Sequence, residues 1–136
     1  SSVIIEEAKR NFGHLENAQF LALEKIELPL KDETIDVVYS NDLIEHLHPS
    51  DAFTHFQEIW RVLKKGGKYY FWTPGSRSGP HDFTGNFCPK GAGILSQASH
   101  IKEYDLKEVS DILKMSKYSN VFIPDNTKEV LLIAEK

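Results

Sequence analysis

The sequence is poor in several features that mark whole classes of protein. Cys88 is the one cysteine in 136 residues, so neither an intrachain disulfide nor a four-thiolate metal site can form. No apolar run approaches the roughly eighteen residues of a membrane-spanning helix, and the first residues carry no leader pattern. Positive charge is in deficit, with 16 Lys+Arg against 20 Asp+Glu, which disfavours nonspecific binding of nucleic acid. We therefore expect a protein of the reducing cytoplasm whose partners include neither membrane nor nucleic acid.

What is present is typical of one globular domain. Hydrophobic residues make up 40% of the chain, charged residues 26% and aromatic residues 11%. These values lie near the average for soluble proteins and far from disordered or fibrous compositions. Glycine, serine and proline are concentrated between Pro74 and Gly93, a stretch that we interpret as a loop rather than a linker. Residues 1–136 are expected to form a single domain.

The first part of the chain predicts a helix and two strands. Apolar residues recur at three-to-four spacing over residues 3–12, and Gly13 suits the end of that helix. Residues 18–23 form a short apolar run that we interpret as a strand. Residues 34–39 combine β-branched and aromatic side chains, which predicts a strand buried on both faces.

The rest of the chain predicts two further helices and three strands. Ser50 is expected to cap a helix that runs to Lys65 and stops at two glycines. Asp105 with Glu108 three residues later forms a capping box for the next helix. Strands are expected at residues 68–73, 119–123 and 129–134. This order predicts an α/β fold, with a mainly parallel sheet that ends in an antiparallel hairpin.

Two motifs follow each other within residues 28–74. The first reads Leu-Pro-Leu-Lys-Asp-Glu-Thr-Ile-Asp-Val-Val-Tyr-Ser-Asn-Asp-Leu-Ile-Glu-His-Leu from residue 28, and the second Glu-Ile-Trp-Arg-Val-Leu-Lys-Lys-Gly-Gly-Lys from residue 58. Together they resemble class I S-adenosylmethionine-dependent methyltransferases. The resemblance implies a Rossmann-like sheet of seven strands in the order 3-2-1-4-5-7-6, with the cofactor across the carboxyl ends of the strands. It also implies methyl transfer to a small-molecule acceptor, with S-adenosylhomocysteine as the product.

The chain departs from that family at its start. No Gly-x-Gly occurs before Gly91, so the glycine-rich turn and the family's first two strands are expected to be missing. Those strands would lie between the predicted strands at 18–23 and 34–39, whose edges would otherwise stay unpaired. Three repairs remain open: direct docking of these two strands, pairing with a second copy in a swapped homodimer, or a sequence that is a fragment.

Six residues match positions where the family holds its cofactor. The resemblance places one group beside the adenine and the other at the end of the strand at 34–39: Glu24, Lys25 and Ile26, and then Ser40, Asn41 and Asp42. Glu24 stands where the family usually has an aspartate. For these first three residues, the alternative is an ordinary solvated loop of charged residues.

The acceptor side is expected to involve the region 75–104 as a lid. His46 resembles the family's histidine near the transferred methyl group and is the candidate general base; the alternative is a helix-capping role. The resemblance assigns substrate contacts to four more residues: His81, Asp82, His100 and Tyr104. Loop-ordering hydrogen bonds are the alternative for His81 and Asp82, and packing ahead of the Asp105 cap is the alternative for Tyr104.

Two other chemistries are not expected. Residues 46–55 hold three histidines and an aspartate, His46, His48, Asp51 and His55, but their spacing does not converge on one metal ion. Cys88 has no helix start beside it and is expected to be inert. The sequence thus leaves two functional hypotheses, a methyltransferase or a degenerate methyltransferase-like module that acts as a dimeric structural or interaction domain.

Overall fold

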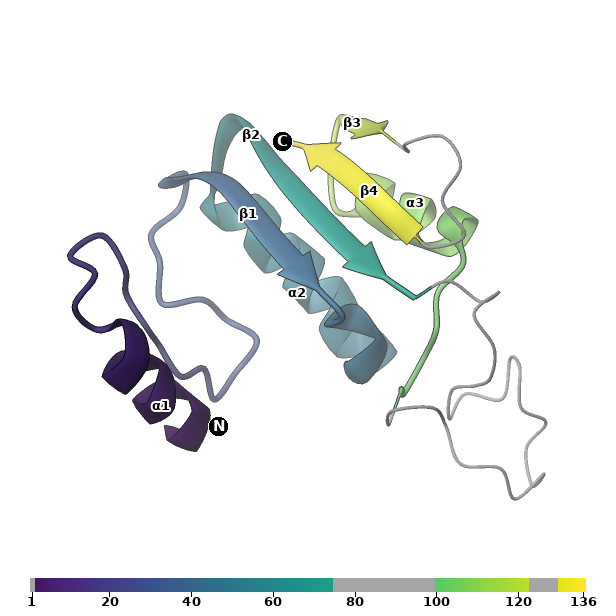
Figure 1. The fold of residues 1–136 in the computed structure, drawn as a ribbon. Helices are drawn as coiled ribbons and strands as arrows, with labels where there is room; N and C mark the ends of the chain where they lie inside the picture. The colour runs from purple at the N-terminus through teal and green to yellow at the C-terminus, as the bar shows by residue number, and fades with distance from the viewer. Residues whose placement is uncertain (1, 75–99, 123–129) are drawn as a thin grey trace, which may run out of the picture.

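The computed structural model describes residues 2–74, 100–122 and 130–136, so most of the predicted lid, with His81, Asp82 and Cys88, lies outside the described residues. Figure 1 shows the order of the elements along the chain. They are α1 (Ser2–Phe12), β1 (Ile35–Asn41), the 3-10 helix η1 (Ile44–His46), α2 (Pro49–Val62), β2 (Leu63–Thr73), α3 (Leu106–Met115), β3 (Asn120–Phe122) and β4 (Val130–Glu135). None of the helices within these ranges has the length and apolar composition needed to span a bilayer.

The four strands form one mixed sheet in the order β1-β2-β4-β3. β1 and β2 are parallel, with Val38 opposite Tyr69, whereas β4 runs antiparallel to both β2 and β3. This order is the 4-5-7-6 part of the order that the resemblance implies. The α/β class and the closing antiparallel strands are confirmed, and a mainly parallel sheet would need the three strands that lie beyond β1 in that order.

Helices α2 and α3 pack on the same face of the sheet, behind the strands in Figure 1. Their buried side chains meet those of β2 and β4 in one core, because the apolar stripes of both helices face the pleat of the sheet. Phe56 on α2 lies 5.5 Å from the Phe71 ring on β2, and Tyr69 stacks on Phe71 at 4.9 Å. The core also contains Ile44, Ala52, Ile59, Leu63, Tyr104, Val109, Leu113, Tyr118, Leu132 and Ala134.

The opposite face of β1 is open to solvent. Val37 is 56% exposed and Tyr39 is 67% exposed, so the prediction of a strand buried on both faces is wrong. A strand is buried on both faces only when a layer covers each of them, and among the described residues helices cover one. Helix α1 forms as predicted, but it has no buried residue and leaves Val3, Ile4 and Phe12 exposed.

The predicted strand at residues 18–23 is also wrong. This segment has no regular structure in the described chain, because a strand exists only where a neighbouring strand pairs with its backbone. β1 has β2 on one side and no described strand on the other. Direct docking of residues 18–23 onto β1 is therefore not the arrangement of this chain.

Helix α2 begins and ends earlier than the sequence indicated. The predicted cap, Ser50, is the second helical residue; His48 is the N-cap and Pro49 occupies the first position, where a missing N–H costs nothing. The Nδ1 atom of His48 accepts a hydrogen bond from the Ser50 backbone at 3.4 Å. At the other end the chain becomes extended at Leu63, which is fully buried, so the two lysines that follow belong to β2.

Arg61 fixes the segment that enters β1. Its guanidinium donates hydrogen bonds to the carbonyl oxygens of Leu28 and Leu30, at 3.0 and 2.8 Å. It also pairs with Asp32 at 2.6 Å and with Glu58 at 2.8 Å, and the Glu58 carboxylate accepts the Leu28 N–H. These bonds to Arg61 hold the pKa of Glu58 below its usual range. One helix residue thereby sets the path of five residues of loop.

The capping box of α3 is confirmed. The Asp105 carboxylate accepts the Glu108 N–H at 2.8 Å, and the Glu108 carboxylate accepts the Asp105 N–H at 3.1 Å.

We expect Asp105→Ala to lower the free energy of unfolding by about 1 kcal/mol, because the first turn loses a bonded N–H. Urea denaturation measures the change. Asp111→Ala in the same helix, which removes only an exposed pair with Lys107, is the control and should leave the free energy of unfolding nearly unchanged. Equal effects of the two substitutions would contradict the prediction.

Candidate functional site

The carboxyl ends of the two parallel strands lie side by side, and the turn after β1 is hydrogen-bonded to the end of β2. The Asp42 N–H donates to the Trp72 carbonyl at 3.1 Å, so the chain leaving β1 stays against the end of β2. Asp42 has a positive φ of 49°, a conformation that aspartate tolerates better than most residues, and it directs the chain into η1. In open α/β sheets this edge is where ligands bind.

Glu45 in η1 is fully buried at this edge. Its Oε2 atom accepts a hydrogen bond from Thr73 Oγ1, at the end of β2, at 2.8 Å. Its Oε1 atom has no hydrogen-bond partner among the described residues. Burial raises the pKa of the Glu45 carboxyl, and the nearby Asp42 carboxylate raises it further. The Oε1 atom therefore lacks the donor that a buried carboxylate oxygen normally has.

A second segment of the chain closes against Glu45. The backbone N–H groups of Ile101 and Lys102 both donate to the Glu45 carbonyl, at 2.7 and 3.1 Å. His100 is 7% exposed, and its Nδ1 atom lies 2.8 Å from the Oε1 atom of Glu103, which is also buried. These contacts bring residues more than fifty positions apart in the sequence to one place.

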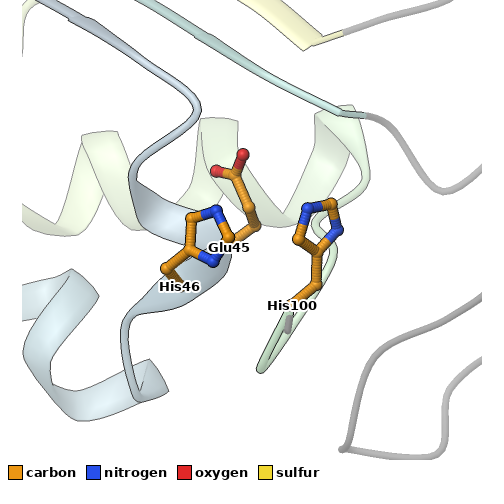
Figure 2. A group of neighbouring side chains, drawn as sticks. All are labelled: Glu45, His46 and His100. Atoms are coloured by element: carbon orange, nitrogen blue, oxygen red, sulfur yellow. The ribbon is translucent and has the colours of Figure 1, made fainter. Parts of the chain in front are cut away.

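Figure 2 shows the imidazole rings of His46 and His100 on either side of the Glu45 side chain. The two ring centroids lie 5.0 Å apart and the ring planes are nearly perpendicular. His46 is exposed, whereas Glu45 and His100 are buried. One potential ligand atom from each of the three residues lies within 4.8 Å of the others. We call these three residues the Glu-His-His cluster.

The structure thus brings together two of the predicted site residues, His46 and His100. It adds Glu45, to which the sequence interpretation gave no role, and Glu103, which that interpretation considered only as a residue able to close the pocket. Two sequence features could have indicated these residues: the acidic residues Asp42 and Glu45 just before His46, and the position of Glu103 three residues after His100. Neither feature shows which of these side chains lie together. Tyr104, another predicted residue, is 1% exposed in the core, with Lys102 Nζ 5.0 Å from its ring centre.

The six predicted cofactor residues lie in two places. Ser40 is half-buried and its hydroxyl is 2.6 Å from the Tyr69 hydroxyl, while Asn41 donates to Asp42 at 2.7 Å. The other three belong to the segment before β1: Glu24 and Lys25 are exposed and Ile26 is half-buried. Within the described chain these three side chains make no hydrogen bond or ion pair, so their role stays a prediction.

Of the four residues first considered as metal ligands, only His46 belongs to the Glu-His-His cluster. His48 caps α2, and Asp51 is exposed in the first turn of that helix. His55 is buried against β2, with its Nε2 atom 3.0 Å from the Tyr69 hydroxyl. The partners that converge with His46 come from elsewhere in the sequence.

Comparison with known proteins gives concordant findings. Residues 1–71 match the family described as methyltransferase domain. The chain is 35% identical over 98 residues to the malonyl-(acyl-carrier protein) O-methyltransferase of Marinomonas sp. (strain MWYL1), covering 71% of this chain and 33% of that protein. It is 31% identical over 112 residues to phosphoethanolamine N-methyltransferase 1 of Zea mays, covering 77% of this chain and 19% of that protein. The chain therefore spans about a third and a fifth of the lengths of these relatives.

The fold is shared with solved structures. The PH0226 protein from Pyrococcus horikoshii OT3 superimposes with a TM-score of 0.71 at 20% identity, over 99% of this chain and 68% of that one. Proteins that share the fold include an S-adenosylmethionine-dependent methyltransferase from Aquifex aeolicus and PigF, the latter solved with S-adenosylhomocysteine. The Rossmann-like class predicted from the sequence is confirmed.

The buried imidazole of His55 predicts a dependence of stability on pH. Burial lowers its pKa to about 4, against 6.5 for a free imidazole, so between these values the unfolded chain holds the proton that the folded chain lacks. The part of the free energy of unfolding that depends on a neutral His55 is therefore fully present above pH 6.5 and is lost as the pH falls toward 4. We expect a loss on the order of 3 kcal/mol from this group between pH 7 and pH 4.

Urea denaturation at several pH values measures this loss. His55→Gln keeps a polar group near the Tyr69 hydroxyl but does not titrate, so its stability should fall less steeply over the same range. Parallel curves for the two proteins would show that His55 does not cause the dependence.

Proposed function

Because the chain belongs to the methyltransferase domain family, we propose that it transfers the methyl group of S-adenosylmethionine to a small-molecule acceptor. The observation that carries the proposal is the position of the Glu-His-His cluster. It lies where β1 and β2 end, beside the turn at Asp42, and that is the edge at which open α/β sheets bind ligands.

In this proposal the turn after β1 and the segment at 24–26 bind the cofactor. Asn41 and Asp42 are exposed and offer polar groups at the strand end, and Ser40 lies just before them. Glu24 would accept a hydrogen bond from the adenine amino group, with Lys25 and Ile26 flanking the ring. These six positions are the ones that the family resemblance supplies.

His46 is proposed as the group that receives the acceptor's proton. It is the exposed member of the Glu-His-His cluster, so it is the one that a diffusing molecule can reach. The acceptor's oxygen or nitrogen attacks the methyl carbon, the bond from that carbon to sulfur breaks, and S-adenosylhomocysteine leaves. The acceptor proton passes to the imidazole, a type of assistance that contributes about 10²-fold or more.

The proposed acceptor is a small molecule, and no particular compound is assigned. The two curated relatives carry different acceptors in their names, a malonyl group on a carrier protein and phosphoethanolamine. His100 and Tyr104 are proposed on the acceptor side together with His81 and Asp82. A cytoplasmic location belongs to the same proposal, since Cys88 is the only cysteine.

The open edge of β1 favours a second candidate function, a dimeric structural or interaction module. β1 is an edge strand of the described sheet, and its open face carries Val37 and Tyr39. An exposed apolar edge strand is a template for pairing with another chain. A second copy of this chain could pair along that edge.

Oligomeric state tests the module. If β1 pairs with a second copy, light scattering after size exclusion should give twice the chain mass. Tyr39→Lys should shift the protein to the monomer, because a charge on an edge strand opposes pairing. Lys68→Ala, an exposed change on the neighbouring strand, is the control. A monomer at every concentration would exclude the dimeric module.

Titration with S-adenosylhomocysteine tests the enzyme. We expect saturable binding in calorimetry at micromolar ligand, unchanged in His46→Gln, because the imidazole faces the acceptor rather than the cofactor. Methyl transfer by His46→Gln should fall by about 10²-fold in kcat. His48→Gln, which alters an exposed histidine at the start of α2, is the control for kcat. A folded chain that does not bind up to millimolar ligand would overturn the proposal for the chain as it stands.

A further inference from the structure

The ligand geometry of the Glu-His-His cluster suits one small cation. Bonds from zinc-like ions to nitrogen and oxygen are about 2.0–2.2 Å, so atoms bound tetrahedrally to one ion lie about 3.3–3.6 Å apart. The candidate atoms of Glu45, His46 and His100 lie within 4.8 Å of one another. Side-chain rotations that shorten the longest of these separations by at most about 1.5 Å would bring all three atoms onto one ion.

The contacts of His100 prepare it as a ligand. Figure 2 shows one nitrogen of its ring turned toward Glu45 and the other turned away. Nδ1 is held by the buried Glu103 carboxylate at 2.8 Å, so a proton on Nδ1 leaves Nε2 with a free lone pair. A carboxylate bonded to the far nitrogen of an imidazole is the usual outer partner of a metal-bound histidine.

The buried carboxylate of Glu45 supplies the second observation. Its Oε1 atom has no donor among the described residues, and an unsatisfied buried acceptor opposes folding. The ammonium group of Lys102, on the closing segment, pairs with Glu108 at 2.8 Å. The carboxylate of Asp42 brings a second negative charge to the same edge. A cation would satisfy the Oε1 atom and offset both charges.

We propose that Glu45, His46 and His100 bind one divalent transition-metal ion, of the zinc, cobalt or manganese type. Two imidazole nitrogens with one carboxylate oxygen favour such ions over calcium or magnesium, which prefer oxygen ligands throughout. Three protein ligands leave positions open for water, for Asp42 or for an acceptor oxygen. Glu103 acts as a positioning residue that orients His100.

The use of the ion rests on the proposed function, but its binding does not. An imidazole that coordinates the ion has no free lone pair for a proton. With the ion bound, an acceptor hydroxyl would lose its proton to water after the ion lowers its pKa, and the oxygen would then attack the methyl carbon. Metal-independent methyl transfer would therefore support His46 as the base, and metal-dependent transfer would support the ion.

Direct titration tests the binding. Tag-free chain, freed of metal by a chelator, is titrated with Zn²⁺ and with Mg²⁺ in calorimetry, and with Co²⁺ followed by visible absorption. We expect one Zn²⁺ or Co²⁺ per chain at micromolar or tighter affinity, at least tenfold tighter than Mg²⁺, with no cofactor present. The His46 side chain is exposed, so His46→Ala should fold normally, and we expect it to weaken Zn²⁺ binding by about 100-fold. Glu103→Gln should weaken Zn²⁺ binding by about 10- to 100-fold.

His14→Ala provides the control, because His14 is exposed in the turn after α1 and is not among the clustered residues. Its Zn²⁺ affinity should equal that of the unaltered chain. The proposal is overturned if the metal-free chain shows no saturable Zn²⁺ or Co²⁺ binding, or if binding is the same in His46→Ala and Glu103→Gln. Loss of S-adenosylhomocysteine binding with intact Zn²⁺ binding would count against the proposed function alone.

Discussion

Parallel pairing of β1 with β2 is the constraint on which the site depends. Parallel strands end at the same edge, so the turn at Asp42 must lie beside the last residues of β2. That juxtaposition lets Thr73 reach the Glu45 carboxylate across the sheet edge. The apolar core, in which Phe56 of α2 packs on Phe71 of β2, lies beneath the paired strands. A polar site is thus positioned by apolar packing that takes no part in its chemistry.

Burial of the polar residues at that edge opposes folding unless hydrogen bonds or a bound ligand compensate for the lost water. Burying a carboxylate without a full set of donors opposes folding, and Glu45 is such a case. His55 and Tyr69, in contrast, satisfy each other at 3.0 Å within the core, and their contact is explained by packing. The unsatisfied oxygen of Glu45 points to a functional role, whereas the satisfied pair of His55 and Tyr69 does not. This difference also separates His46 from His48 and His55, which lie within ten residues of it.

The single helical layer divides the sheet into two unlike faces. The face under α2 and α3 holds the core, while β1 presents Val37 and Tyr39 to solvent on the other face, and no described strand pairs with its outer edge. An apolar edge that pairs with nothing favours association. The chain matches only a part of the length of its curated relatives, and the open surface lies at β1, the strand next to which the family order places its remaining strands.

The sequence by itself determined the elements whose signals are local. The capping box at Asp105, the helix before Gly13 and the family motifs around Ile35–Asn41 are all readable from neighbouring residues. It could not determine that residues 18–23 would stay unpaired, because a strand depends on a partner that local sequence does not specify. Nor could it pair His100 with Glu45, since more than fifty residues separate them and the backbone hydrogen bonds of Ile101 and Lys102 to Glu45 form only in the folded chain. Local propensity fixed the pieces, and long-range hydrogen bonding and packing decided the site.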